Sequence, residues 1–280
     1  MPRATSAKER CAARPRHAAP LVAAPAESFH SWVASQQDAA PTRSKGERTR
    51  DRIRLATVEL LNTVGYRQLK VADICARAGI TQPVLYRYFE NKQALTLDVL
   101  QEFLARFVDA PRDPGTTTPY RAIYEANLRW ITMARANAGL MRCLLDASDD
   151  EPAFAAIFAR ETDRWNRRIA DSVLRRFPSA STDRKAIEFA VTIIGGMVDE
   201  LVRRLFATRS EDVRRLAHAV APNDPTLAHF ISVLWYRALY GGDPPSGEGI
   251  KVVPTLVRAA RTAGKRPRVT GSRTTRRPID

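Results

Sequence analysis

The chain has 280 residues, and the 44% that are hydrophobic can bury the core of one large domain or two modest ones. Its net charge of +15 favours a polyanionic partner, nucleic acid before membrane, unless the basic residues only keep the surface solvated. Apolar runs are too short to cross a bilayer, and charges and prolines interrupt the N-terminus, so neither a membrane span nor secretion is expected. Three widely spaced cysteines indicate free thiols in the reducing cytoplasm.

The N-terminal segment is rich in Ala, Pro, Arg and Ser, which is typical of disorder, although residues 26–37 form a short amphipathic stretch. Helical spacing of apolar residues then continues to Tyr240 without convincing period-2 alternation, so we expect an all-α protein. A linker, GGDPPSGEG, follows, and no acidic residue occurs between Lys251 and Arg277. The expected divisions are a basic disordered arm over 1–44, a first helical domain over 45–109, a second over 110–241 and a basic disordered tail over 242–280.

Glycine and proline mark the ends of the expected helices. The first helix places its apolar residues on one face and ends at Gly65, and a proline-rich break at 111–115 separates the two domains. The expected helices are 47–64, 71–78, 82–89 and 92–108 in the first domain, and 118–136, 138–147, 152–177, 183–208, 210–220 and 224–240 in the second.

The stretch GITQPVLYRYFENK, residues 79–92, predicts the turn and second helix of a helix-turn-helix. Gly79 can adopt the positive φ that ends the preceding helix. Thr81 is a good N-cap, and Pro83 falls in the first turn, where its missing N–H has no intrahelical partner. The Thr81 side chain is therefore expected to accept a hydrogen bond from the N–H of Val84.

The helix after this turn has two different faces. Leu85 and Phe89 form an i,i+4 pair that points inward together with Val84. The residues of the other face have no core to enter, and a helix of this width fits the major groove of B-DNA. Their hydroxyl and basic groups can donate to phosphate oxygens. The outward residues are Gln82, Pro83, Tyr86, Arg87 and Tyr88, with Lys92 at the start of the next helix.

A long motif runs through residues 47–108, carried by Ala56, Leu60, Gly65, Tyr66, Val71, Asp73, Ile74, Ala78, Gly79, Ile80, Leu85, Tyr86, Tyr88, Phe89, Lys92 and Leu95. It resembles the DNA-binding domain of the TetR family of transcriptional regulators. The resemblance implies an all-helical homodimer, with an N-terminal three-helix helix-turn-helix DNA-binding domain plus a larger helical domain for ligand binding and dimerisation. Matched residue by residue, it assigns DNA contacts to Thr81, Gln82, Pro83, Tyr86, Tyr88 and Lys92, whereas Arg87 lies at a variable position.

One departure from the family pattern precedes the second helix. Members often carry a capping threonine there, but this chain has Leu69 and Lys70, and the missing cap costs about 1 kcal/mol. Lys70 could still reach a phosphate through its charge. Arg43, Lys45 and Arg48 could contact the DNA backbone as part of a leading arm, or they could simply lie on a solvated surface, and the sequence favours neither alternative. Arg52 and Arg54 are interpreted as solvated.

The segment 186–206 contains two adjacent glycines in mid-helix, Gly195 and Gly196, each costing roughly 1 kcal/mol relative to alanine. Close approach of a partner helix or of a ligand would explain them. The family resemblance favours the partner, because this segment and 224–240 match the helices of a four-helix dimer interface. The expected interface residues are Ile194, Gly195, Leu201, Phe230 and Leu234.

Aromatic and methionine residues of the second domain could line a cavity, although each alone is more often plain core. Together they could enclose an apolar pocket for a hydrophobic effector. The candidates are Tyr124, Trp130, Met133, Met141, Phe158, Trp165 and Met197.

The sequence carries no nucleophile motif, phosphate-binding glycine loop or paired catalytic carboxylates, so no enzyme, catalytic residue or cofactor is expected. The acidic run that ends at Glu151 suits the start of the following helix better than a metal site, and the scattered histidines lack metal-ligand spacing. We therefore expect a cytoplasmic, sequence-specific repressor that a small effector releases from a palindromic double-stranded DNA operator. The alternatives are an activator, a broad DNA-binding protein that relies on its basic tails, and a small-molecule-binding or enzymatic module with a vestigial DNA-binding head.

Overall fold

A computed structural model describes residues 28–38, 44–109, 118–145, 151–176 and 183–245, and every regular element within them is a helix. The all-α prediction is confirmed for this part of the chain. Arg43, Cys11 and most of both predicted tails lie outside the described residues. The helices are α1 (Phe29–Asp38), α2 (Lys45–Thr63), α3 (Gly65–Gln68), α4 (Val71–Ala78), α5 (Gln82–Tyr86), α6 (Lys92–Asp109), α7 (Pro119–Ala136), α8 (Ala138–Leu145), α9 (Pro152–Arg176), α10 (Arg184–Val202), a π-helical turn (Arg203–Ala207), α11 (Glu211–Val220) and α12 (Asp224–Tyr240).

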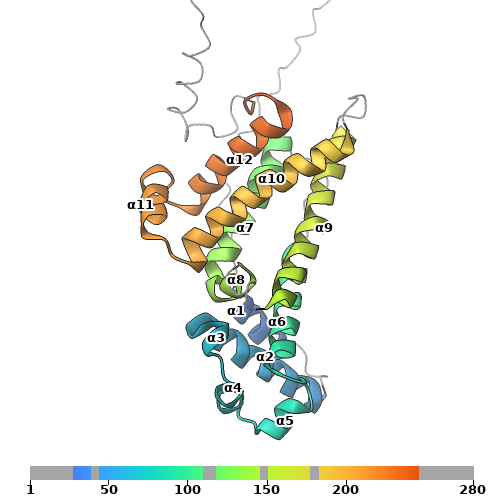
Figure 1. Ribbon diagram of the computed structural model, residues 1–280, viewed down its shortest axis with the longest axis vertical. Coiled ribbons are helices and arrows are strands. Elements are labelled where there is room, and N and C mark those ends of the chain that lie inside the picture. The colour runs from blue at the N-terminus through green and yellow to red at the C-terminus, as the bar shows by residue number, and fades with distance from the viewer. Residues whose placement is uncertain (1–27, 39–43, 110–117, 146–150, 177–182, 246–280) are drawn as a thin grey trace, which may run out of the picture.

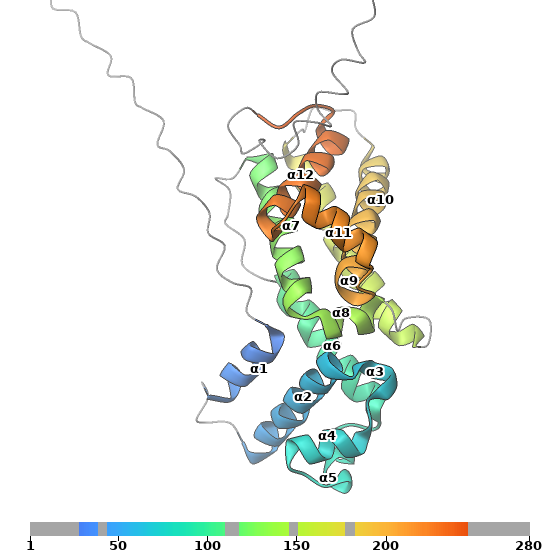
Figure 2. The same cartoon turned by 90° about the vertical axis from the view of Figure 1, so that its left-hand side faces the viewer.

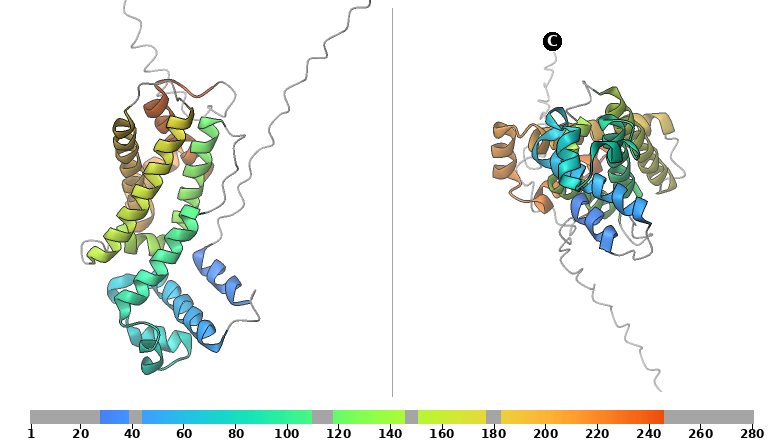
Figure 3. Two further views of the ribbon diagram at one scale, coloured as in Figure 1. Left: turned by 90° about the vertical axis from the view of Figure 1, so that its right-hand side faces the viewer. Right: turned by 90° about the horizontal axis from the view of Figure 1, so that it is seen from below.

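The helices form two domains stacked along the long axis of the molecule (Figure 1). Helices α2 to α5 lie at one end, and α7 and α9 to α12 lie at the other. Helix α6 runs from the first domain towards the second and packs against α9 (Figure 3). The short α5 occupies the tip of the first domain, far from α10, α11 and α12 (Figures 1 and 2).

Side-chain caps explain where several helices begin. The Ser44 hydroxyl accepts from the Glu47 N–H at 3.2 Å, and the Glu47 carboxylate accepts from the Ser44 N–H at 2.8 Å, which is a complete capping box at α2. Asn223 and Thr226 form the same reciprocal arrangement at α12. Each cap satisfies N–H groups that have no partner inside the helix, so these starts are determined locally.

Most predicted helix boundaries lie within two residues of those in the structure, and the larger differences concern α5, α3 and the end of α10. Helix α5 ends at Tyr86 and not at residue 89, and the chain continues as turns held by the Leu85 carbonyl, which accepts from the N–H groups of Tyr88 and Phe89. The four-residue α3 was not expected. The predicted helix 183–208 changes at Arg203 into a π-helical turn, a wider winding in which the backbone hydrogen bonds skip one more residue.

The expectation that the whole N-terminal arm is disordered is wrong for α1. Its Phe29 ring is buried, lying 5.4 Å from Trp32 and 5.5 Å from Phe103 of α6 between ring centroids. The Phe29 N–H donates to the Asn137 side chain of the second domain at 2.7 Å. Arg106 of α6 lies over the Trp32 ring at 4.4 Å. The amphipathic stretch seen in the sequence is thus ordered by partners that come from distant segments, and α1 lies beside α2 (Figure 2).

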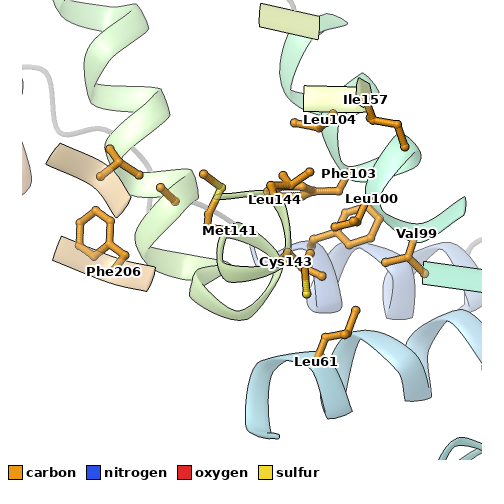
Figure 4. Packing of buried hydrophobic residues seen from close by; sticks show 14 of the residues in the cluster. Leu61, Val99, Leu100, Phe103, Leu104, Met141, Cys143, Leu144, Ile157 and Phe206 are labelled. Atoms are coloured by element: carbon orange, nitrogen blue, oxygen red, sulfur yellow. The ribbon is translucent and has the colours of Figure 1, made fainter. Parts of the chain in front are cut away.

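One hydrophobic core extends through both domains. At the junction, Leu61 of α2 and Leu100 and Phe103 of α6 lie close to Cys143 and Leu144 of α8 (Figure 4). All five side chains are nearly or completely removed from solvent. Because the core has no break at the domain boundary, a displacement in one domain must be accommodated by the other. Cys75 and Cys143 are buried free thiols, as predicted.

Gly139 of α8 lets the main chains of the two domains come close together at this junction. Its N–H donates to the Asn62 side chain at 3.1 Å. A Cβ at this position would lie 2.4 Å from the Asn62 Cα and 2.6 Å from the Leu61 carbonyl oxygen, far inside contact distance. Glycine at position 139 is therefore what lets α8 rest on the end of α2.

Candidate nucleic-acid interface and effector cavity

The helix-turn-helix is built from α4, a turn and α5. Helix α4 buries Ile74, Cys75 and Ala78, and it ends at Gly79, whose φ of 63° and ψ of 43° are left-handed as predicted. Behind α5, Leu85 has no exposed surface and Phe89 is buried. These two contacts hold the short helix against the domain, because five residues form too few hydrogen bonds to be stable alone.

The predicted outward face of α5 is exposed. Thr81, Gln82, Pro83 and Arg87 are exposed, and Tyr86 keeps 50% of its surface accessible. Tyr88 is half-buried and packs against the core. Polar and aromatic side chains with no partner from the core thus cover the tip of the molecule, which is the arrangement expected of a groove-binding helix.

Neither α4 nor α5 has a side-chain cap at its start, although one was predicted for α5. The Thr81 side chain makes no capping hydrogen bond, and its backbone carbonyl accepts from the N–H groups of Val84 and Leu85 at 3.0 and 3.2 Å instead. The predicted bond from the Val84 N–H to the Thr81 side chain is therefore wrong. Lys70 provides no side-chain cap to α4, as its residue type predicted. The Thr81 hydroxyl and the Lys70 ammonium both remain on the exposed surface of the helix-turn-helix.

The basic residues near α2 have two different environments. Lys45 and Arg48 are exposed, as a contact to phosphates requires. Arg54, which the sequence placed on a solvated surface, is half-buried and pairs with Asp98 at 2.6 Å and with Glu102 at 3.0 Å. This ion pair joins α2 to α6, so Arg54 stabilises the domain from within.

Lys92 is also held by the protein. Its ammonium donates to the Tyr66 carbonyl at 3.2 Å and lies 4.3 Å from the centroid of the Tyr66 ring. A DNA contact by Lys92 stays a prediction. It requires the ammonium either to bind a phosphate while it keeps its contacts with Tyr66 or to move away from Tyr66.

Glu151, at the start of α9, connects the two domains. One carboxylate oxygen accepts from the Tyr66 hydroxyl at 2.7 Å, and the other accepts from the Gln93 side chain at 2.5 Å. Burial and the Glu151 carboxylate together raise the pKa of the Tyr66 phenol above its usual range. The sequence placed Glu151 at a helix start, which is correct, but gave no signal that its partners come from the first domain.

A cavity of about 700 Å³ lies between α7, α9, α10 and α12 of the second domain. Three of the predicted effector residues, Trp130, Phe158 and Trp165, line it. Trp235 and Leu239 of α12, which were not predicted, complete the apolar wall. This volume is in the range of small-molecule sites.

The other four predicted effector residues are not among the residues that line the cavity. Tyr124 is buried and stacks on His229 with ring centroids 3.9 Å apart. Met141 is fully buried in the junction core (Figure 4), and Met133 packs against the core. Met197 points outward from α10 with 59% of its surface exposed. These four residues therefore lie outside the wall of this cavity.

The outer face of α10 is apolar and exposed. Phe189 and Ile193 keep 68% and 50% of their surfaces accessible and lie two turns and one turn, respectively, before Met197. On the neighbouring α12, Leu234 is exposed, as the predicted interface requires, and Phe230 is half-buried. Of the remaining predicted interface residues, Ile194 and Leu201 pack against the core, and Gly195 lines the cavity. The structure thus places Gly195 beside the cavity and Met197 on the outer face, the reverse of their predicted places.

Among the described residues, no group of His, Cys, Asp and Glu could hold a metal ion, and no helix is long and apolar enough to span a membrane.

Comparisons with known proteins agree with this arrangement. Residues 53–99 match the family model for bacterial regulatory proteins of the tetR family. The chain is 24% identical to the HTH-type transcriptional regulator BetI of Cronobacter sakazakii, over 76% of this chain and 90% of that protein. It is 33% identical to the tetracycline repressor protein class C of Escherichia coli, over 28% of this chain and 35% of that protein. A solved structure of the fatty acid degradation regulator FadR from Bacillus halodurans has the same fold, with a TM-score of 0.54 and 19% identity over 71% of this chain and 98% of that chain.

Proposed function

Because the chain belongs to the TetR family of transcriptional regulators, we propose that it is a repressor that binds a palindromic operator as a homodimer and releases it when an effector fills the cavity. The observation that carries the proposal is the exposed polar face of α5, anchored from behind by Leu85 and Phe89. One relative that matches this chain is named as a repressor and another as an activator, so the likeness supports regulation of transcription in either direction.

Helix α5 is the element that reads the bases. The Gln82 amide can donate to and accept from an adenine edge in the major groove. The hydroxyls of Tyr86 and Thr81 donate to phosphates, and the charges of Lys45, Arg48 and Lys70 strengthen the backbone contact. These basic contacts set the register of the helix on the duplex, while Gln82 supplies sequence preference.

Dimerisation follows from the size of the reading element. A helix of five residues contacts only a few base pairs, so useful specificity needs two half-sites on one face of the DNA. The exposed apolar residues Phe189, Ile193 and Met197 of α10, with Leu234 of α12, supply a surface that a second copy of the chain would cover. This surface lies at the opposite end of the molecule from α5 (Figure 1), so the dimer leaves both reading helices accessible.

Release of the operator depends on the junction. The cavity is bordered by α9, and the same helix begins next to Glu151, which holds Tyr66 and Gln93 of the first domain. A ligand that moves α9 therefore moves the first domain too. Half-sites about one DNA turn apart tolerate little change in the separation of the two α5 helices, so a small tilt lowers affinity.

Footprinting of the full-length protein on the DNA upstream of its own gene tests the proposal. We expect a protected palindrome at physiological salt, and we expect Gln82→Ala to lose about 1–3 kcal/mol of binding free energy at one position of each half-site. Arg167→Ala, an exposed change on α9 away from α5, is the matched control and should bind normally. A footprint that is absent, or that survives in Gln82→Ala with the same sequence preference, would refute the assignment. A reporter fused to the operator distinguishes repression from activation.

A further inference from the structure

The wall of the cavity contains a carboxylate that no residue in the described part of the chain balances. Asp199 of α10 lines the cavity, and no described residue forms a hydrogen bond or an ion pair with its side chain. The position is notable because its neighbours along α10, Gly195 and Val198, also face the cavity, whereas Gly196 and Met197 face outward. Asp199 is thus directed to the ligand site by the register of the helix.

The other acidic residues of the cavity wall already have basic partners. Glu125 pairs with Arg121 at 2.9 Å, and Asp171 pairs with Arg184 at 2.7 Å. Glu161 lies 3.5 Å from Arg160 and 3.6 Å from Arg164. Each of these carboxylates is therefore compensated by a charge on its own helix or on the next one.

The basic residues of the wall are also engaged. Burial lowers the pKa of the Arg129 guanidinium, but Arg129 has interactions of its own, including the charge of Glu125 one helical turn away. Arg176 donates a hydrogen bond to the Tyr240 hydroxyl. Arg168 has its own interactions, and Arg175 is exposed at the end of α9. Arg175 can be hydrated where it lies, whereas Asp199 is a buried charged group of the wall for which the described residues supply no partner.

Aromatic rings form much of the remaining wall. Trp130, Phe158, Trp165, Trp235 and Tyr240 all contribute to it. The faces of such rings carry partial negative charge and attract cations, most strongly where water is excluded. An apolar, aromatic cavity that contains an unbalanced carboxylate is complementary to an apolar body that carries a positive charge.

We propose that the effector is an organic cation, a protonated amine or a quaternary ammonium on an apolar body, whose charge pairs with Asp199 while its body lies against the tryptophans. This inference rests on the proposed function, because it names the chemical class of the effector. Burial raises the pKa of Asp199 to about 7, which is the sign of a carboxylate that lacks compensation, and a bound cation supplies that compensation. The volume of about 700 Å³ accommodates a drug-sized molecule.

Two ions of equal size and opposite charge provide the test. Tetraphenylphosphonium and tetraphenylborate are titrated into the full-length protein, and binding is followed by the fluorescence of the tryptophans that line the cavity. We expect saturable binding of the phosphonium that weakens at least tenfold in Asp199→Asn, and weaker binding of the borate that this variant does not reduce. Asp163→Asn is the matched control, because it makes the same change on an exposed position of α9 and should bind as wild type does.

Three outcomes would overturn the inference: no saturable binding of the phosphonium up to its solubility, tighter binding of the borate, or unchanged phosphonium affinity in Asp199→Asn. Circular dichroism of Asp199→Asn confirms that it folds, and folding is expected because the variant removes a buried, uncompensated charge. A second measurement, release of operator DNA, separates this inference from the proposed function. If the phosphonium binds through Asp199 without releasing DNA, the effector role of the cavity fails; if a carboxylic acid releases DNA while the cation does not bind, only the ligand class fails.

Discussion

A single methyl group at position 139 should push the two domains apart. A Cβ on Gly139 would lie 2.4 Å from the Asn62 Cα and 2.6 Å from the Leu61 carbonyl oxygen, and both of these are main-chain atoms of α2 that no rotamer change can move. Non-bonded carbon atoms pack at about 3.5–4.0 Å, so Gly139→Ala must separate α8 from α2 by about 1 Å. Overpacking of this kind costs about 1–3 kcal/mol of unfolding free energy.

Urea unfolding measures the stability part of this prediction, and operator titration measures its functional part. We expect Gly139→Ala to unfold at lower urea concentration with an unchanged helical spectrum, and to bind the operator more weakly because the first domain is displaced. Gly242→Ala is the matched control, since a Cβ there meets no atom within 4 Å. Equal urea midpoints and equal operator affinities for Gly139→Ala and wild type would show that the junction accommodates the extra methyl group without displacing the first domain. The argument for rigid coupling between the domains would then fail.

Three further variants address α10, the outer face and α1. Burial raises the pKa of Asp199 from its ordinary 3.8 to about 7, so the folded state holds the proton more tightly than the unfolded chain does. The free energy of unfolding that the protonated Asp199 contributes below pH 4 is therefore lost as pH rises through 7, by up to about 4 kcal/mol at about 1.4 kcal/mol per pKa unit. Asp199→Asn should lack this loss when urea unfolding is measured at pH 4 and pH 8. The same change in unfolding free energy between the two pH values in both proteins would contradict the assignment. Phe189→Asp should turn the dimer into monomers in sedimentation velocity without lowering monomer stability, because its ring is mostly exposed, and an unchanged dimer would exclude this face of α10 as the interface. Phe29→Ala should lower the unfolding free energy by about 3–5 kcal/mol because its ring is buried against Phe103, and a loss below about 1 kcal/mol would mean that α1 is only loosely held.

The helix-turn-helix could be predicted from the sequence because its signals are local. Gly79 adopts the left-handed conformation that only glycine accepts without strain, and α4 and α5 begin where the pattern placed them. The burial of Leu85 and the exposure of Tyr86 follow from helical periodicity alone. The end of α5 could not be predicted in the same way, because the turns after Tyr86 have no glycine or proline to mark them.

The cavity and the outer face were harder because α10 is apolar on more than one side. A helix that is hydrophobic around much of its circumference does not reveal which side meets the core, and rotation by a single residue changes the answer by about 100°. Gly195 and Met197, two residues apart, were therefore assigned to each other's environments. The spacing of Phe189, Ile193 and Met197 at every fourth residue was the available signal, since three exposed apolar residues in one row indicate a surface for a partner.

Contacts between segments that are distant in the sequence could not be predicted from local sequence patterns. Phe29 and Trp32 lie in a stretch whose composition indicates disorder, and only Phe103, Arg106 and Asn137 give them a place to pack. Such pairings depend on tertiary structure, which overrides local propensity.

The unbroken core between the two domains has a practical consequence for finding the effector. Two domains that share buried side chains such as Leu61 and Leu144 should melt together in a single calorimetric transition. Any molecule that occupies the cavity then raises the melting temperature of the whole chain by mass action, including the end that carries α5. A compound library can accordingly be screened by thermal shift with protein alone, before any promoter is known.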